Sequence, residues 1–496
     1  MLKNTRFLVV FALLLLVFGN FALGDQERQS KEQEKEWGKE RYEEGEQGKN
    51  PYVLQEHHFR AKVESPHGRV RVLPKFTEWS NLLRGIENYR LSILEAEPQT
   101  FVIPNHWDAE AVVFVVQGQG SLSLVHRERR ESFNIRRGDV IRIPSGTTVY
   151  LINKDNSQKL IAAKLLQPVF SPGEFETFFG AGGQEPESFY RSFSIEILEA
   201  ALKAKRERIE AVLGQQRRGP IIKASQEQIR ALSQHEQGGI WPFGGESKGL
   251  INIFQKGPSH SNQYGQLYEV NQNDYRPLYD VNVAVSFANV TQASKLIGNM
   301  EGLFYNSRST KISLVIRGEG ELQITCPHLS SQSEGRRGPG SQQGQGEREG
   351  RQGSQQGQEE REGRQGSQEE RGERERERGE STGTPHYQRV SARLRPYTAF
   401  VVPPGHPYVV VASKRQNLEV LCFEIFSFGN EKVPVAGRRN VIKRLEKEAK
   451  ELSFGVSSRI VDEVFGNEED EFLFKGPAGG REQQQQQEQE EGRADA

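Results

Sequence analysis

The stretch "ITCPH", Ile324 to His328, places a thiol and an imidazole two positions apart. In an extended strand such side chains point to the same face, so Cys326 and His328 are spaced like two ligands of one metal ion. Three interpretations are open: a metal site, half of a disulfide, or a small buried cysteine beside a surface histidine. The spacing alone favours the third, because a C-x-H pattern is short and common.

Only one other cysteine is present, so the chain contains at most one disulfide. Cys422 lies in "LEVLCFEIF", a strand-like apolar run in which a free thiol is an ordinary core residue. A bridge to Cys326 requires Cα atoms within about 7 Å, which the sequence does not determine. The fold must therefore be stabilised mainly by its hydrophobic cores.

The N-terminal residues 1–24 have the basic start, apolar run and small residues of a secretory signal peptide. Residues 25–50 are nearly all charged or amide side chains and are predicted to be a disordered leader. Without Lys3 and Arg6 the formal charge falls from −1 to about −3, so no global field attracts nucleic acid or a membrane. No later apolar run has the length of a membrane span.

From residue 51 the chain consists of short apolar runs separated by Gly, Pro and Asn, a pattern typical of a β-sandwich or barrel. This pattern occurs twice. "VVFVVQGQGSLSLV" resembles "ISLVIRGEGELQIT", and "IRIPSG" resembles "FVVPPG". The second copy is longer between these motifs because residues 330–385 form an Arg, Glu, Gln and Gly tract, which is predicted to be a disordered loop. Acids alternate with the arginines there and aromatics are absent, so RNA binding is not expected.

Each copy ends in a helical pattern. In the first copy the pattern ends at Gly214 and is followed by "ASQEQIRALSQ", where Ser225 and Gln228 have the spacing of a capping box. In the second, "NVIKRLEKEAKELSF" predicts a helix from Val441. We therefore expect two units, residues 51–235 and 236–465, and a disordered tail over 466–496. The apolar helix stripes need a partner, for which a neighbouring subunit is the natural candidate.

At this point the sequence resembles the vicilins, the 7S seed storage globulins of the two-barrel cupin superfamily. The matching stretches include "NPYVLQEHHF", "NYRLSILEAEPQTFVIPNHWDAEAVVFVVQG", "GDVIRIPSGTTVYLIN", "FYNSRSTKISLVIRGEG" and "VVPPGHP". The resemblance implies a mainly β bicupin: two jelly-roll cupin barrels, each followed by an α-helical extension. It also implies a homotrimer, deposited in the protein storage vacuole of a seed and broken down at germination.

Enzymatic cupins hold a metal with several His and Glu side chains that converge inside the barrel. Aligned on the shared "FVVQG", this chain has lost nearly all of them, so we predict no catalytic residue and no enzyme. His106 alone keeps a ligand type, and one ligand cannot hold a catalytic metal. The residues at these positions are Pro104, His106, Ala111 and Val149 in the first copy, and Phe304, Asn306, Lys311 and Tyr408 in the second.

The second copy carries a different set of metal ligands. A subset of vicilins with the same "CPH" and "GHP" motifs binds copper, and the resemblance places the ligands on Cys326, His328 and His406. In some members a tyrosine of the "NPY" segment approaches the metal, and Tyr52 is its match. Thiolate sulfur with imidazole suits copper or zinc, and the soft sulfur favours copper.

Asn289 in "NVT" is the candidate glycosylation site. The leading hypothesis for function is a non-enzymatic storage protein with a copper ion in its second barrel. The alternative is a two-cupin protein that binds a small ligand such as a sugar in a barrel mouth, as sucrose-binding relatives of vicilins do. Abundance separates the two: a reserve protein dominates seed extract and disappears at germination.

Overall fold

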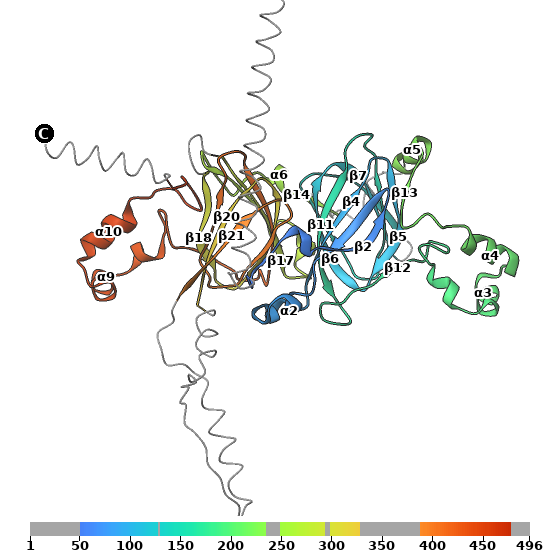
Figure 1. Cartoon of the computed structure of the whole chain (residues 1–496), viewed down its shortest axis with the longest axis horizontal. Coiled ribbons are helices and arrows are strands. Elements are labelled where there is room, and N and C mark those ends of the chain that lie inside the picture. Colours follow the sequence, from blue (N-terminus) through green and yellow to red (C-terminus); the bar gives the residue numbers. More distant parts are fainter. Residues whose placement is uncertain (1–49, 127–128, 235–248, 293–297, 328–386, 478–496) are drawn as a thin grey trace, which may run out of the picture.

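The structure of the protein is a computed structural model that describes residues 50–126, 129–234, 249–292, 298–327 and 387–477. Two β-barrels lie side by side, with α3 (Ile195–Leu202) and α4 (Arg206–Gly214) beyond one of them and α9 (Lys447–Phe454) and α10 (Ser458–Gly466) beyond the other (Figure 1). The expectation of a mainly β chain with two barrels followed by helices is confirmed. The predicted signal peptide, most of the predicted leader and the 330–385 tract lie outside the described residues.

The first barrel is built from two antiparallel sheets. One has the strand order β14 (Ile251–Asn252), β9 (Asp139–Ile143), β6 (Ala109–Gln117), β11 (Leu160–Pro168), β4 (Arg90–Ala96), β3 (Gly68–Val72) and β2 (Arg60–Ser65). The other has the order β12 (Thr177–Phe178), β5 (Thr100–Trp107), β10 (Thr148–Asn153), β7 (Gln119–His126) and β8 (Arg129–Arg136), with β13 (Ile221–Lys223) also paired to β5.

The second barrel repeats this arrangement. Its larger sheet has the order β1 (Val53–Leu54), β22 (Ala399–Val402), β19 (Thr310–Arg317), β24 (Leu418–Ile425), β17 (Val283–Val290), β16 (Gly265–Val270) and β15 (His260–Asn262). The other sheet has the order β21 (Gln388–Leu394), β20 (Gly320–Cys326), β23 (Tyr408–Ala412), β18 (Met300–Asn306) and β25 (Lys432–Pro434), with β26 (Leu473–Phe474) also paired to β18. The internal repeat of the sequence is therefore a repeat of strand order.

The two larger sheets face each other across the middle of the molecule. Strand β11 shows why its sequence is continuously apolar: Ala162 and Leu166 belong to the core of the first barrel, whereas Ile161 and Leu165 belong to the core shared with the second. Between the sheets, the rings of Phe114 and Phe287 stack with centroids 5.9 Å apart. A strand buried on both faces loses the alternation of polar and apolar residues that marks a half-exposed strand.

Each barrel receives an edge strand from the segment that precedes the other barrel. β1 precedes the first barrel but pairs with β22 of the second, with Leu54 opposite Ala399. β14 precedes the second barrel but pairs with β9 of the first, with Asn252 opposite Asp139. The outer strands β22 and β9 of the two large sheets are thereby each covered by a segment that lies next to the other barrel in the sequence.

The described α-helices are short and differ in part from the expected ones. Lys203, in the left-handed region with φ 50°, separates the first pair, and Gly455, with φ 67°, separates the last pair. The expected helix from Val441 is wrong at its start, since Val441–Arg444 forms a 3-10 turn. The helices are α2 (Phe76–Trp79), α3 (Ile195–Leu202), α4 (Arg206–Gly214), α5 (Gln226–Gln234), α6 (Ile253–Lys256), α9 (Lys447–Phe454) and α10 (Ser458–Gly466).

Two local expectations have opposite outcomes. The capping box of α5 is confirmed: the Ser225 backbone N–H donates to Gln228 Oε1 at 2.9 Å, and the Gln228 N–H donates to Ser225 Oγ at 3.2 Å. The disordered tail from residue 466 is wrong over its first part. Leu473 and Phe474 are buried, and they pair with Glu301 and Met300 as strand β26. Their apolar side chains pack against the second barrel, and the polar part of the tail follows them in the sequence.

Asn252 ties the exchanged strand β14 to the first barrel. Its amide donates to Asp139 Oδ1 at 2.7 Å and to the Arg137 carbonyl at 2.9 Å, and its oxygen caps α6. We expect Asn252→Ala to lower the free energy of unfolding by about 2–4 kcal/mol, because Asp139 then keeps only the hydrogen bond from the Arg136 N–H and the end of α6 loses its cap. Urea denaturation measures this. Ser225→Ala, which removes only the exposed cap of α5, is the control and should cost about 1 kcal/mol; equal losses would contradict the role of Asn252.

Candidate functional site

Three of the four candidate copper ligands lie together at one end of the second barrel. Cys326 ends β20 and is fully buried, and the Tyr52 hydroxyl lies 3.4 Å from its Sγ. The rings of Tyr52 and His406 meet edge to face with centroids 6.2 Å apart. His328, the fourth candidate, lies outside the described residues. Within those residues, no three His, Cys, Asp or Glu side chains form a metal-binding group.

The strand exchange places Tyr52 at this point. As β1 joins the sheet beside β22, the Val401 N–H donates to the Tyr52 carbonyl at 2.9 Å. The turn that carries His406 lies between β22 and β23, and the Thr325 N–H donates to the Pro407 carbonyl at 2.9 Å. Two backbone hydrogen bonds therefore hold the tyrosine, the cysteine and the histidine in fixed relation.

The chemistry of this cluster fits a soft metal. The Nδ1 atom of His406 lies 2.9 Å from the Pro404 carbonyl oxygen, which can only accept, so Nδ1 carries the proton and Nε2 has the lone pair. Burial raises the pKa of Tyr52 well above its usual value, and the hydrogen bond with Cys326 raises it further, so the phenol stays neutral. Thiolate sulfur and imidazole nitrogen are ligands suited to copper.

The disulfide alternative is contradicted. Both cysteines are free and buried, and they lie in different sheets of the second barrel. Ser313 Oγ donates to Cys422 Sγ at 3.3 Å, and burial raises the pKa of the Cys422 thiol. Cys422 is therefore a neutral, buried side chain on β24.

The interior of the second barrel holds a network of buried lysine, tyrosine and glutamate side chains where enzymatic cupins hold their metal. Lys311 donates to the Tyr408 hydroxyl, which donates to Glu301 Oε1 at 2.9 Å, and Lys311 Nζ lies 3.6 Å from the same carboxylate oxygen. All three side chains are almost fully buried. Lys311 and Tyr408 occupy two of the former ligand positions, so an ammonium and a phenol now fill the place of a metal.

A second lysine extends the network. Lys432 contacts Glu269 and lies 3.4 Å from Glu424, which accepts a hydrogen bond from Ser286 Oγ at 2.8 Å. Burial alone would raise the pKa of Glu269, but Lys432 outweighs it and lowers that pKa to about 2. For Lys311, burial acts to lower the pKa, but nearby anionic groups, Glu301 and Glu424 among them, raise it above its usual value. The groups stabilise each other as ions.

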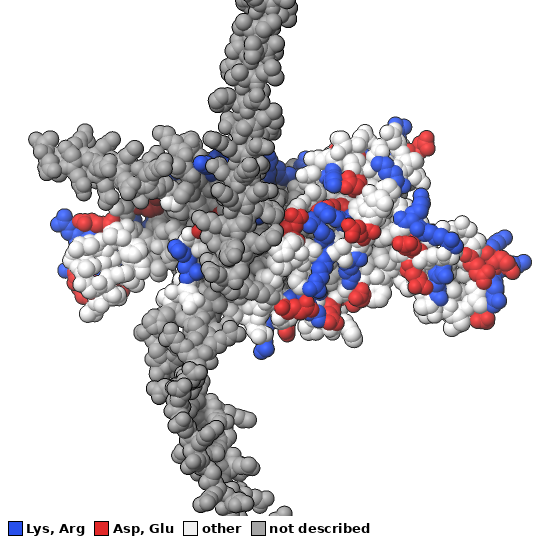
Figure 2. All heavy atoms as spheres, viewed as in Figure 1, with Lys and Arg blue, Asp and Glu red and all other residues white. Residues whose placement is uncertain are grey.

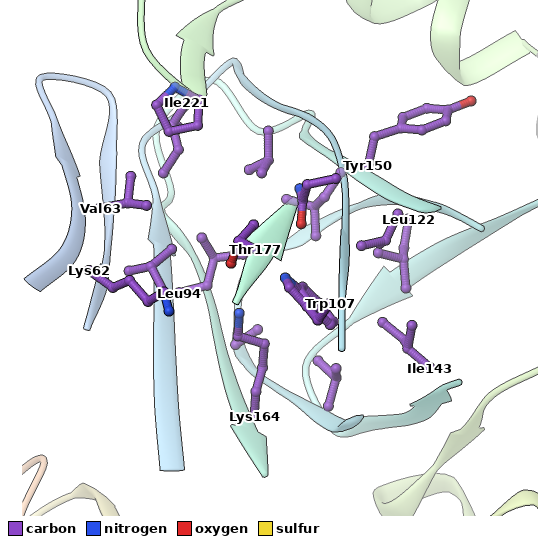
Figure 3. A pocket seen from close by; sticks show the side chains of 18 of the residues that line it. Lys62, Val63, Leu94, Trp107, Leu122, Ile143, Tyr150, Lys164, Thr177 and Ile221 are labelled. Atoms are coloured by element: carbon purple, nitrogen blue, oxygen red, sulfur yellow. The ribbon is translucent and has the colours of Figure 1, made fainter. Parts of the chain in front are cut away.

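The first barrel has an apolar interior instead. Ala111 and Val149 are buried core residues, and His106 stacks on Phe178 with ring centroids 5.1 Å apart. A cavity of about 80 Å³ lies inside this barrel, lined mainly by Val, Leu, Ile and aromatic side chains. Its residues include Lys164 and Trp107, which lie close together in Figure 3.

The candidate glycosylation residue Asn289 lies on β17, a strand with neighbours on both sides. Its Oδ1 accepts a hydrogen bond from Asn417 Nδ2 at 3.3 Å, and its side chain is half-buried. The hydroxyl of Thr291 is also engaged, since it donates to the Gln263 carbonyl at 3.3 Å. Modification of Asn289 remains a prediction.

Comparison with known proteins places the chain in a family. A family model described as cupin matches residues 80–207 and 251–462. A vicilin of Corylus avellana, Cor a 11.0101, is 47% identical over 454 residues, which cover 91% of this chain and 88% of the relative. A vicilin of Juglans regia, Jug r 6.0101, is 47% identical over 90% of this chain and 81% of its own length. The chain belongs to the vicilins.

Solved vicilin structures agree with the fold. The crystal structure of the Corylus avellana vicilin superposes with a TM-score of 0.72 at 48% identity, covering 86% of this chain and all of that one. A vicilin from Solanum melongena, whose title reports different anionic ligands in structurally similar pockets, gives a TM-score of 0.73 at 33% identity, over 86% of this chain and 99% of that one. The bicupin fold and the seed storage function of a vicilin are thereby confirmed.

Sequence reasoning found the lost metal ligands of this vicilin but missed what replaced them. Glu301, Glu424 and Lys432 lie on different strands. Only for Glu424 does the sequence carry a signal of burial, because it interrupts the apolar run "LCFEIF". On the face seen in Figure 2, acidic and basic side chains of the described part are intermingled. Among the described helices, none has both the length and the apolar character that crossing a membrane requires.

Removing one charge of the network should be more harmful than removing a pair. Lys311→Met leaves Glu301 buried without its cation, so we expect a loss of about 3–5 kcal/mol in the free energy of unfolding. Adding Glu301→Gln to Lys311→Met should restore part of that loss, by at least about 1 kcal/mol. Denaturant unfolding of the two single variants and the double variant provides the cycle. Strictly additive losses would show that the two side chains do not interact.

Proposed function

We propose that this vicilin serves as a nutrient reserve without catalysing a reaction, as a homotrimer in the storage vacuole of the seed, with one copper ion in its second barrel. The interior of the second barrel carries the non-enzymatic part of this proposal. A catalytic metal needs converging ligands and an open position, whereas Lys311, Tyr408 and Glu301 saturate one another there. The interior of the second barrel therefore stabilises the fold and offers no open position for a catalytic metal.

The trimer is supported by the apolar side chains that the helices leave exposed. Ile197, Leu202 and Val212 on α3 and α4 are 51% to 71% exposed, and Leu452, Ile460 and Val464 on α9 and α10 are 50% to 87% exposed. The two helix pairs lie at opposite ends of the molecule in Figure 1, so the end of one protomer can meet the other end of the next. Such head-to-tail contacts close into a ring when the rotation allows it.

Charges placed on the helix pairs should therefore break the assembly. Leu452→Asp with Val212→Asp is expected to shift the native mass from three chains to one, because a buried carboxylate without a partner costs several kcal/mol at each contact. Native mass spectrometry or light scattering measures this. Tyr387→Asp, at an exposed aromatic residue outside the helices, is the control and should leave the mass unchanged. A wild-type protein that is already monomeric would contradict the trimer.

The copper proposal rests on the convergence of Tyr52, Cys326 and His406. Cys326 supplies a buried sulfur, His406 presents Nε2 because Nδ1 is held by Pro404, and the Tyr52 hydroxyl adjoins the sulfur. His328, two residues beyond Cys326, is the expected third ligand. When bound, the metal would crosslink strand β20, the β22–β23 turn and the N-terminal strand. We propose a closed structural role for it.

Purified native protein should contain up to one copper per chain, and Cys326→Ser should remove it. Elemental analysis of protein kept from chelators, together with native mass, reports metal and oligomer in one experiment. Cys422→Ser is the matched control, since that thiol is buried elsewhere in the same barrel, and it should retain the metal. Less than about a tenth of an equivalent in the wild type would exclude this site.

The alternative of a sugar-binding protein finds less support. A protein of Glycine max called a sucrose-binding protein is 41% identical over 421 residues, covering 84% of this chain and 71% of that relative. The described cavity of the first barrel is lined mainly by apolar side chains, whereas a sugar requires many hydrogen-bonding partners. The storage role, with the secretory route that the N-terminal sequence predicts, is the function that we propose.

A further inference from the structure

The second barrel carries a C-terminal strap, residues 470–474, which follows α10 in the sequence. The Asn262 amide on β15 donates to the Leu473 carbonyl at 2.9 Å. The Gly302 N–H on β18 donates to the Phe472 carbonyl at 2.9 Å, and β26 pairs with the same strand. Because β15 and β18 belong to different sheets, the strap is attached to both sheets of the barrel.

The ring of Phe472 packs this strap against the barrel. Phe472 is buried, and its ring meets Phe304 and His260 edge to face, with centroids 5.0 and 4.6 Å away. The other contacts of Phe304 include the ammonium groups of Lys311 and Lys432, which lie 5.2 and 5.6 Å from the centre of its ring. Detachment of the strap would therefore remove an aromatic cover from the buried charge network.

The backbone of the strap is strained. Phe472 has φ 64°, which lies in the left-handed region that a bulky side chain rarely adopts. Such a conformation persists only while the surrounding contacts enforce it, and the strain is released when the segment detaches. Weakening one contact of Phe472 therefore favours opening of the strap.

His260 is the contact of the strap that pH can change, because imidazole gains its charge between about pH 8 and pH 5. The charged groups of the described residues that face it are Glu269 on β16, Lys432 on β25, Arg439 after β25 and Glu471 in the strap. Lys432 already contacts Glu269. Arg439 Nε lies 2.7 Å from both carboxylate oxygens of Glu471. A protonated His260 would therefore meet carboxylates that are already paired, beside two other cations.

We propose that the C-terminal strap is a pH-dependent latch, which neutral His260 keeps closed and protonated His260 releases. This regulation goes beyond the storage role and depends on neither the copper ion nor the trimer. Release would separate β26 from β18 and free the end of the chain for proteolysis. Acidification would thereby open the second barrel from its C-terminal side.

The electrostatics of His260 give the direction of the pH dependence. Burial lowers the pKa of His260; Lys432 and Arg439 lower it further, whereas Glu269 and Glu471 oppose them without reversing the shift. The closed strap therefore binds a proton less readily than the open one. Its stability is complete above the ordinary histidine pKa of about 6.5 and is lost as the pH falls below that value.

Hydrogen exchange of the purified full chain near pH 7.5 and about pH 5 tests the latch. Exchange rates are divided by the intrinsic rates at each pH, and the Gly302 amide reports release because it donates to the Phe472 carbonyl. We expect the protection of Gly302 and of residues 470–474 to fall at least about threefold at the lower pH. The Ile103 amide of the first barrel, which donates to the Pro220 carbonyl, should keep its protection within about twofold.

Matched variants identify the responsible residue. His260→Phe keeps an aromatic ring beside Phe472 but cannot be protonated, so it should abolish the acid-induced loss of protection. His260→Gln, neutral at both pH values, should do the same, and thermal melting checks that each variant folds. His126→Phe, at an exposed histidine of the first barrel, should leave the loss unchanged.

Two results would overturn the proposal. One is a wild-type strap whose protection at the lower pH equals or exceeds that near pH 7.5, because the attraction of Glu471 for the imidazolium would then outweigh the cost of burying it. The other is an acid-induced loss that persists in either folded His260 variant, since another group would then control the strap.

Discussion

The reciprocal exchange of edge strands is the constraint on which the rest of this molecule depends. β1 completes the large sheet of the second barrel, and β14 completes that of the first. Each barrel therefore lacks an edge strand unless the other is in place, and the inner sheets are held face to face around Phe114 and Phe287. The same exchange brings Tyr52 to Cys326, so the candidate metal site exists only in the joined molecule. The pairing of β1 with β22 therefore both links the two barrels and brings Tyr52 to the candidate site.

The two barrels have the same strand order, but different kinds of side chain occupy the interior where enzymatic cupins bind their metal. In the second barrel the vacated interior is filled by lysines and glutamates that neutralise one another, with Lys311 at the centre. In the first, apolar side chains fill it and leave a cavity beside Lys164, for which the described residues offer no anionic partner. Charged side chains that pair with one another fill the interior of the second barrel. Apolar side chains in the first barrel leave a cavity instead. The same strand order therefore surrounds matched charges in one barrel and an apolar cavity in the other.

The sequence predicted the features that repeat or that depend on neighbouring residues. The two barrels followed from the duplicated motifs, and the α5 cap followed from Ser225 and Gln228, because both are local patterns. It did not predict features set by distant pairing. Nothing local shows that Leu54 belongs beside Ala399 or that Leu473 is covered, since two-residue strands carry no periodicity. The partnership of Cys326 with Tyr52 came from family resemblance, and the isolation of Lys164 depends on which side chains surround it in three dimensions.

The placement of β1 also determines when the protein can be completed during synthesis. Leu54 leaves the ribosome early, but its partner Ala399 is made only after hundreds of further residues. At about 5–20 residues per second, the N-terminal strand waits on the order of tens of seconds before it can dock. The first barrel can assemble in that interval, including the edge that β14 covers, because Ile251 and Asn252 are made well before Ala399. Translation order thus makes the junction at Tyr52 one of the last parts of the chain to close.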